Sequence, residues 1–137
     1  MHKAKLAGYA ALALVVAFGL GWAFGRSGTS EIRDELATRR LRMMLVEARA
    51  QILDAQVNLY TANFGNASRH LEYARPSLAA AAAELRDQRQ TQQAERITQA
   101  LQALSQAQEL AVKLNQDANS RAGEAARLIG EVLASVP

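Results

Sequence analysis

Apolar residues recur every three or four positions along most of this chain. From residue 32 to residue 132 this spacing lapses only at short polar stretches. A period of three to four residues places the apolar side chains on one face of an α-helix. Only 8 Gly and 2 Pro occur in 137 residues, and much of the apolar content is alanine, the strongest helix former. We therefore expect an all-α protein.

The N-terminal segment is apolar without interruption. Leu6 to Phe24 form 19 residues that carry no charge, and Lys3 and Lys5 precede them. Such a helix would span roughly 28 Å, close to the thickness of a bilayer's hydrocarbon core. Tyr9 and Trp22 lie near its two ends, where aromatic belts form. The segment predicts a transmembrane anchor over residues 1–25, marked by Leu6, Tyr9, Trp22 and Phe24.

A cleaved signal peptide is the alternative for this segment. Ala23-Phe24-Gly25 has the small-x-small pattern of a cleavage site, although the apolar run is longer than the usual signal core. A retained anchor implies a single-pass protein of a bacterial inner membrane, with the bilayer as one partner. Arginines after the anchor favour a cytoplasmic domain, whereas the signal-like start favours export. We expect the remaining domain on the extracytoplasmic side.

The rest of the chain reads as a short joint, residues 26–30, and a helical domain, residues 31–137. Its first helix is expected over about 30–62. Two sets of positions repeat there every seven residues: Ile32, Arg39, Val46, Leu53 and Tyr60, and Leu36, Met43, Ala50, Val57 and Phe64. This is a heptad seam with one arginine in it. Further apolar residues widen the stripe: Leu41, Leu45, Ile52 and Leu59. The pattern predicts a helix that touches more than one neighbour.

Two turns are predicted beyond this helix. Asn63-Phe64-Gly65-Asn66 is the stronger signal, because Asn and Gly accept left-handed backbone and Asn caps helices. A second helix follows over about 66–88, with Pro76 expected to kink it. The polar stretch 87–93 gives the second turn, and a third helix is expected over about 91–134. The sum is an elongated, coiled-coil-like antiparallel three-helix bundle.

One short stretch resembles a known motif. Its residues alternate aromatic, small and large apolar side chains: Leu59, Tyr60, Asn63, Phe64, Gly65, Ala67, His70, Leu71 and Ala74. This order is similar to one helix-turn-helix of the tetratricopeptide type, over about 20 residues and a single copy. The whole pattern also resembles uncharacterised bacterial membrane-anchored proteins with a helical hairpin. The resemblance implies architecture only.

Chemistry-bearing residues are sparse. The chain has no Cys and two His, and its carboxylates are scattered singly along the expected helices. We therefore expect no catalytic, metal-binding or cofactor-binding site. His70 is interpreted as a surface or capping residue, and Met43 as part of the core. The sharper alternative is a ligand-binding cluster of Tyr60, Phe64, His70 and Tyr73 at the hairpin.

The basic residues give one candidate contact. Lys3 and Lys5 account for two of the 16 Lys+Arg, which leaves 14 against 13 Asp+Glu in the rest of the chain. This balance does not indicate a nucleic-acid partner. Arg39, Arg40 and Arg42 form the one cluster, and they are candidates for contact with lipid headgroups or an acidic partner.

These features together favour an interaction protein. We expect a non-enzymatic, membrane-anchored helical scaffold, adaptor or accessory subunit that binds a protein partner or itself. The alternative is a membrane-tethered sensor or small-ligand-binding helical module.

Overall fold

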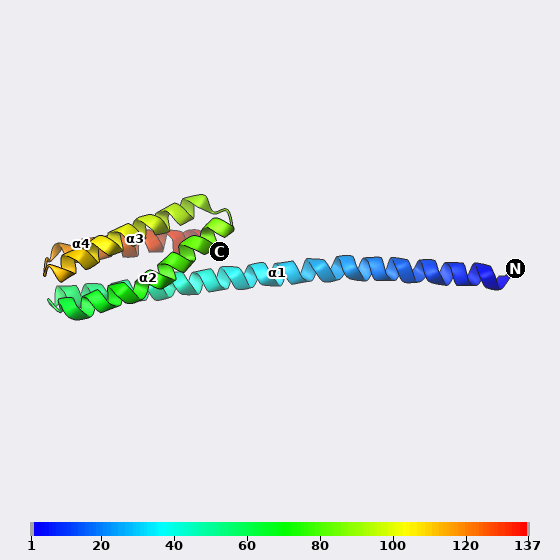
Figure 1. Cartoon of the computed structure of the whole chain (residues 1–137), viewed down its shortest axis with the longest axis horizontal. Coiled ribbons are helices and arrows are strands. Elements are labelled where there is room, and N and C mark those ends of the chain that lie inside the picture. Colours follow the sequence, from blue (N-terminus) through cyan, green and yellow to red (C-terminus); the bar gives the residue numbers. More distant parts are fainter. Residues whose placement is uncertain (1, 137) are drawn as a thin grey trace. The chain divides into compact units, whose positions relative to one another are not determined.

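The computed structural model describes the backbone of residues 2–136 and the side chains of residues 15, 16 and 32–136. The described residues form four α-helices: α1 (His2–Tyr60), α2 (Phe64–Asp87), α3 (Thr91–Val112) and α4 (Asp117–Ser135) (Figure 1). Contacts divide the chain into residues 1–37 and residues 38–137. The first unit is helical wherever its backbone is described. The second contains the end of α1 and all of α2, α3 and α4.

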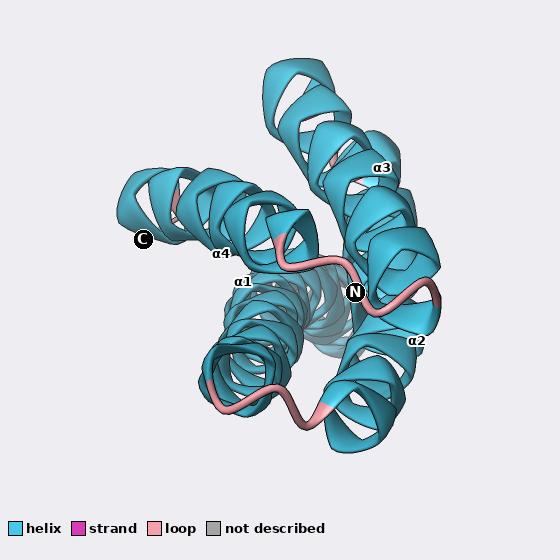
Figure 2. Cartoon of the chain, turned by 90° about the vertical axis from the view of Figure 1, so that its left-hand side faces the viewer, coloured by secondary structure: helices cyan, strands magenta, loops and turns pink. Residues whose placement is uncertain are grey.

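In the second unit the four helices form a closed ring of neighbours. Figure 2 shows α2 beside α1, α3 beside α2, and α4 between α3 and α1. Polar contacts join each neighbouring pair. His70 Nδ1 lies 2.8 Å from Gln51 Oε1 between α2 and α1, and Arg75 donates to Ser105 Oγ between α2 and α3. The short connections make consecutive helices antiparallel.

The core of this bundle is built from alanine and leucine. Each helix contributes one face of residues spaced by three or four, and their small side chains allow the helices to pack closely. The innermost side chains are Leu41, Leu45, Ile52 and Leu59 of α1, Leu71, Leu78 and Leu85 of α2, Ile97 and Leu104 of α3, and Ile129 and Val132 of α4. No described polar side chain is buried among them.

The predicted membrane anchor requires correction. Among the residues whose side chains are described, no helix has an apolar stretch long enough to cross a bilayer. The prediction of a transmembrane helix, and with it the inner-membrane location, is therefore wrong. The described part of α1 carries charges from Arg33 to Asp54. The side chains of Leu6, Tyr9, Trp22 and Phe24 lie outside the described residues.

The three-helix bundle is also corrected, since the described residues form four helices. The expected third helix divides into α3 and α4 at residues 113–116. Leu114 fits the spacing of the apolar stripe, but it has φ 55° and is exposed. Asn115 Oδ1 accepts a hydrogen bond at 2.8 Å from Asp117 N, the first amide of α4, which has no partner within the helix. Two further elements differ from expectation: α1 continues through the expected joint, and α2 continues through Pro76.

All three turns share one backbone pattern. The left-handed residues are Ala62, Arg89 and Leu114, with φ between 55° and 59°. In each turn the next amide donates to the carbonyl five residues earlier, as Asn63 N does to Asn58 O at 2.7 Å and Gln90 N to Leu85 O at 2.8 Å. This is the Schellman ending of a helix, which usually places glycine at the left-handed position. In this protein a residue other than glycine takes the left-handed position in all three turns.

Replacing Leu114 by glycine should therefore stabilise the bundle. A non-glycine residue in left-handed backbone costs about 1 kcal/mol, so Leu114→Gly should raise the free energy of unfolding by about that amount. The matched control is Gln106→Gly, in the exposed middle of α3, which should lower it by about 1 kcal/mol. Urea titration followed by circular dichroism measures both. A loss of stability in Leu114→Gly equal to that of the control would contradict the assignment of the turn.

The core assignment makes a second prediction. Leu71 is fully buried in α2 and Tyr73, two residues later, is 62% exposed. Leu71→Ala leaves a cavity and should lower the free energy of unfolding by about 2–5 kcal/mol. Tyr73→Ala should change it by less than about 1 kcal/mol. Equal losses for the two variants in the same urea titration would show that this face of α2 is not the buried one.

Candidate functional site

Two opposite faces of α1 are apolar. The face toward the bundle consists of buried residues: Leu41, Leu45, Ala48, Ile52, Ala55 and Leu59. The other face follows the predicted heptad seam, and its large side chains are exposed. We call this second face in residues 38–60 the α1 stripe: Met43, Val46, Leu53, Val57 and Tyr60. Tyr60 is 82% exposed and Val57 64%.

The heptad seam was thus recognised in the sequence, but it does not make the intramolecular core. The bundle instead buries the apolar residues beside the seam: Leu41, Leu45, Ile52 and Leu59. Met43, interpreted above as core, is 69% exposed, and its neighbour Met44 packs against the core. In the first unit, Ile32 and Leu36 continue the heptad spacing and are exposed as well. Such a row of exposed apolar side chains is a candidate interaction surface.

Three long polar side chains separate the α1 stripe from α4. They stand seven residues apart, and each donates to α4: Arg42 Nη1 to Val136 O at 3.1 Å, Arg49 Nε to Ala126 O at 3.3 Å, and Gln56 Nε2 to Asn119 O at 3.4 Å. Arg42 therefore places a cation at the C-terminal end of α4, where the helix dipole favours one. These contacts fix how α1 lies against α4.

Glycines on α4 make room for two of these side chains. A Cβ atom at Gly123 would lie 3.0 Å from Gln56 Nε2, and one at Gly130 would lie 3.6 Å from Arg49 Nε. The first is tighter than an ordinary contact and the second is not. Both glycines lie inside α4, where alanine is the better helix former.

Alanine substitution of these glycines should separate the two effects. Gly130→Ala should raise the free energy of unfolding by about 0.5–1 kcal/mol, because helix propensity improves without a clash. Gly123→Ala should gain less, because the Gln56 amide must move. Parallel urea titrations compare them. A larger gain for Gly123→Ala would contradict the packing of Gln56 on α4.

The α1 stripe borders an open hollow of about 390 Å³. Its lining comes from the end of α1 and the start of α4: Leu53, Gln56, Val57, Tyr60, Thr61 and Asn119. Of the proposed ligand cluster, only Tyr60 lines it. Phe64 packs against the core, His70 faces Gln51, and Tyr73 is exposed on α2. The hollow is a widening of the exposed stripe, with apolar walls.

The predicted turn lies slightly earlier in the chain than expected, and the arginine cluster lies on α1. The chain turns at residues 61–63, and Asn63 Oδ1 accepts from Asn66 N at 3.4 Å. Phe64, Gly65 and Asn66 belong to the first turn of α2, so Ala62 and not Gly65 takes the left-handed backbone. Arg39 and Arg40 are exposed on α1, and Arg42 contacts α4. Contact of these arginines with lipid headgroups or an acidic partner stays a prediction.

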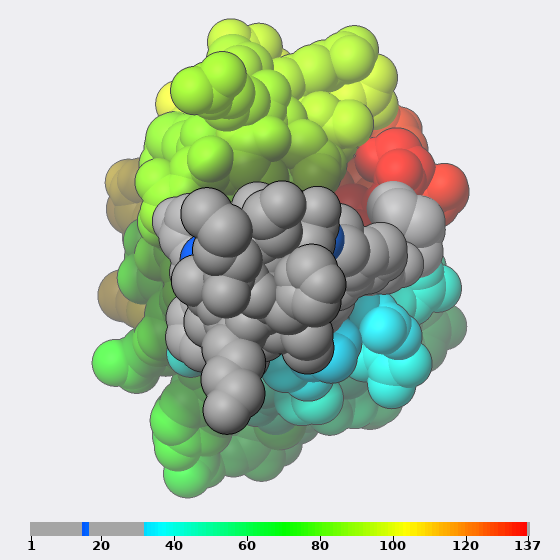
Figure 3. Space-filling view, turned by 90° about the vertical axis from the view of Figure 1, so that its right-hand side faces the viewer, coloured from blue at the N-terminus to red at the C-terminus, as the bar shows by residue number. Residues whose placement is uncertain are grey.

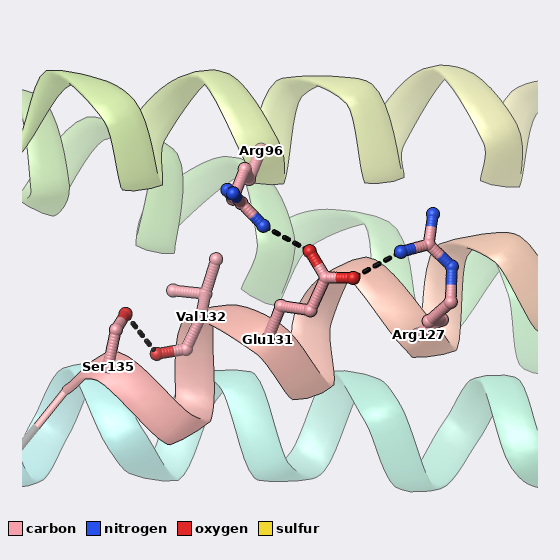
Figure 4. A network of polar contacts seen from close by, with 5 residues as sticks. All are labelled: Arg96, Arg127, Glu131, Val132 and Ser135. Carbon is pink, nitrogen blue, oxygen red and sulfur yellow. Dashed lines mark hydrogen bonds and ion pairs between the residues drawn. The ribbon is translucent and has the colours of Figure 1, made fainter.

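A second polar cluster lies at the far end of α4. Glu131 forms ion pairs with Arg96 of α3 and Arg127 of α4, and Ser135 Oγ donates to Val132 O at 2.8 Å (Figure 4). The C-terminal residues lie beside the α2–α3 turn at this end (Figure 3). All of these charges are partly exposed, so the cluster joins α3 to α4 as a surface network of modest strength. The pKa of the Glu109 carboxyl is lowered by a hydrogen bond from Lys113, on the exposed face of α3.

No protein-family model, curated protein or solved structure matches this chain. The resemblance to a tetratricopeptide-type hairpin therefore stays a prediction, as does the absence of catalytic, metal and cofactor sites. Sequence reasoning missed the contacts of Arg49 and Gln56 with α4. The spacing of seven residues from Arg42 to Arg49 and from Arg49 to Gln56 was the signal that could have found them.

Proposed function

We propose that this chain is a non-enzymatic helical scaffold or adaptor that binds a heptad-patterned helix of a protein along the α1 stripe. The observation that supports the proposal is the exposure of Met43, Val46, Leu53, Val57 and Tyr60 on a helix whose opposite face is buried. The bundle holds α1 folded and presents its second apolar face to solvent.

The spacing of the stripe defines the kind of partner. With Ala50 between Val46 and Leu53, its positions alternate by three and four over more than two heptads. This is the geometry by which one helix inserts side chains between those of another. A small molecule would contact only part of a row of this length, whereas an amphipathic helix can cover the whole row with its own apolar side chains. Leu53, Val57 and Tyr60 of this row also line the open hollow.

Protection of the stripe inside cells tests the proposal. The chain has no cysteine of its own, so one introduced thiol reports on one position. Val57→Cys is compared with Tyr73→Cys, because the two native side chains are 64% and 62% exposed. After reduction, a cell-permeant maleimide should modify Val57→Cys about tenfold more slowly, as expected if about nine in ten stripes are covered.

The same two variants in denaturant give the reference rates, which should be equal. A Val57→Cys thiol that reacts in cells as fast as Tyr73→Cys would overturn the proposal, because the stripe would then be open to solvent. Met43→Cys, at the other end of the stripe, should be protected to a similar degree.

A further inference from the structure

We propose that the helix bound to the α1 stripe is the same segment of a second copy of this chain, aligned parallel and in register. This inference rests on the function proposed above and names its partner. It is carried by the charges that flank the stripe, together with the heptad positions of the apolar residues.

The stripe occupies the two inward positions of a heptad. Met43, Ala50 and Val57 take position a, and Val46, Leu53 and Tyr60 take position d. The bundle covers the opposite positions, c and f, which include Leu45 and Ala48. One side of α1 is therefore already occupied, and the other has the narrow a/d seam that suits a single added helix.

Charges at the flanking positions are complementary in a parallel pair. In such a pair, each residue at position g lies near the residue five places later, at position e, of the other helix. Arg42 then meets Glu47 of the second copy, and Arg49 meets Asp54 of the second copy. Both contacts join opposite charges, and two-fold symmetry repeats each of them. In the sequence, Glu35 and Arg40 continue the pattern one heptad earlier.

The side chains in these pairs are accessible. Arg42 and Arg49 each donate a hydrogen bond to a backbone carbonyl of α4. A guanidinium has five N–H donors, so each arginine has further donors for a second contact. Glu47 and Asp54 are exposed and form no ion pair with any residue whose side chain is described. The two arginines can therefore keep their contacts with α4 and still meet a carboxylate across the seam.

Other alignments bring like charges together. A parallel pair that slips by one heptad places Arg42 opposite Arg40 of the second copy. An antiparallel pair with full overlap of the two stripes places Glu47 nearest Asp54 of the second copy. Like charges at such positions weaken a coiled coil and select against that alignment. In the parallel, in-register pair, Arg42 and Arg49 both lie near acidic residues of the second copy.

Arg39 occupies one d position and would face its counterpart in the second copy. A polar residue at a single seam position costs stability and restricts register and the number of helices. The long aliphatic stem of arginine can lie along the seam while the guanidinium reaches solvent. The pairing therefore accommodates Arg39 at a cost in affinity.

Cysteine cross-linking of the purified full chain tests this pairing. In a parallel, in-register pair each a position faces itself, so Val57→Cys and Met43→Cys should each form a disulfide-linked dimer under mild oxidation. In the antiparallel pair the two copies of residue 57 would be about 16 Å apart along the axis, and those of residue 43 about 25 Å. Tyr73→Cys, equally exposed on α2, should give about tenfold less dimer, since only chance collisions link it.

Light scattering of the unmodified chain should give the mass of a dimer. A monomer whose Val57→Cys forms no more disulfide than Tyr73→Cys would overturn this inference, while protection of the stripe in cells would leave the proposed function standing. A mixture of Val46→Cys and Val57→Cys that links only to each other would show the antiparallel pair, and would overturn the orientation. If the stripe is also unprotected in cells, both proposals fall.

Discussion

The architecture depends on how α1 divides its apolar residues between two faces. Leu41, Leu45, Ile52 and Leu59 are buried against α2 and α4, and this burial supplies a large share of the bundle's core. The second face adds nothing to that core. Packing of the first face favours the helix, and so the bundle maintains an exposed heptad seam on the second face.

Alanine makes the bundle possible at this size. Ala48 and Ala55 of α1, Ala74 and Ala81 of α2, and Ala122 and Ala125 of α4 are fully buried. Small side chains let neighbouring helices approach, and each costs little side-chain entropy when it is buried. The larger residues then fill the space between helices, while Arg42, Arg49 and Gln56 tie α1 to α4 from the edge. Specific alignment of the helices thus comes from a few long side chains around a core of small ones.

The sequence was sufficient for the helical class and for the heptad seam, but not for which face the bundle buries. Ile52 and Leu53 are adjacent and equally apolar, yet the first is fully buried and the second is 41% exposed. Their spacing patterns overlap, so only the positions of α2 and α4 decide between them. The break at Leu114 was missed for a related reason. Its backbone is left-handed without glycine, because the Schellman hydrogen bonds and the packing of α3 on α4 hold it there.

A helix with one face in the fold and one face in solvent links the two by mass action. Anything that binds the α1 stripe only when α1 is helical must also favour the folded bundle, since both faces belong to one backbone. The melting temperature of such a protein then depends on its concentration and on the supply of its partner. At low abundance the chain relies on its small core alone. A partner that occupies the stripe would add to the stability of the bundle without contacting its buried core.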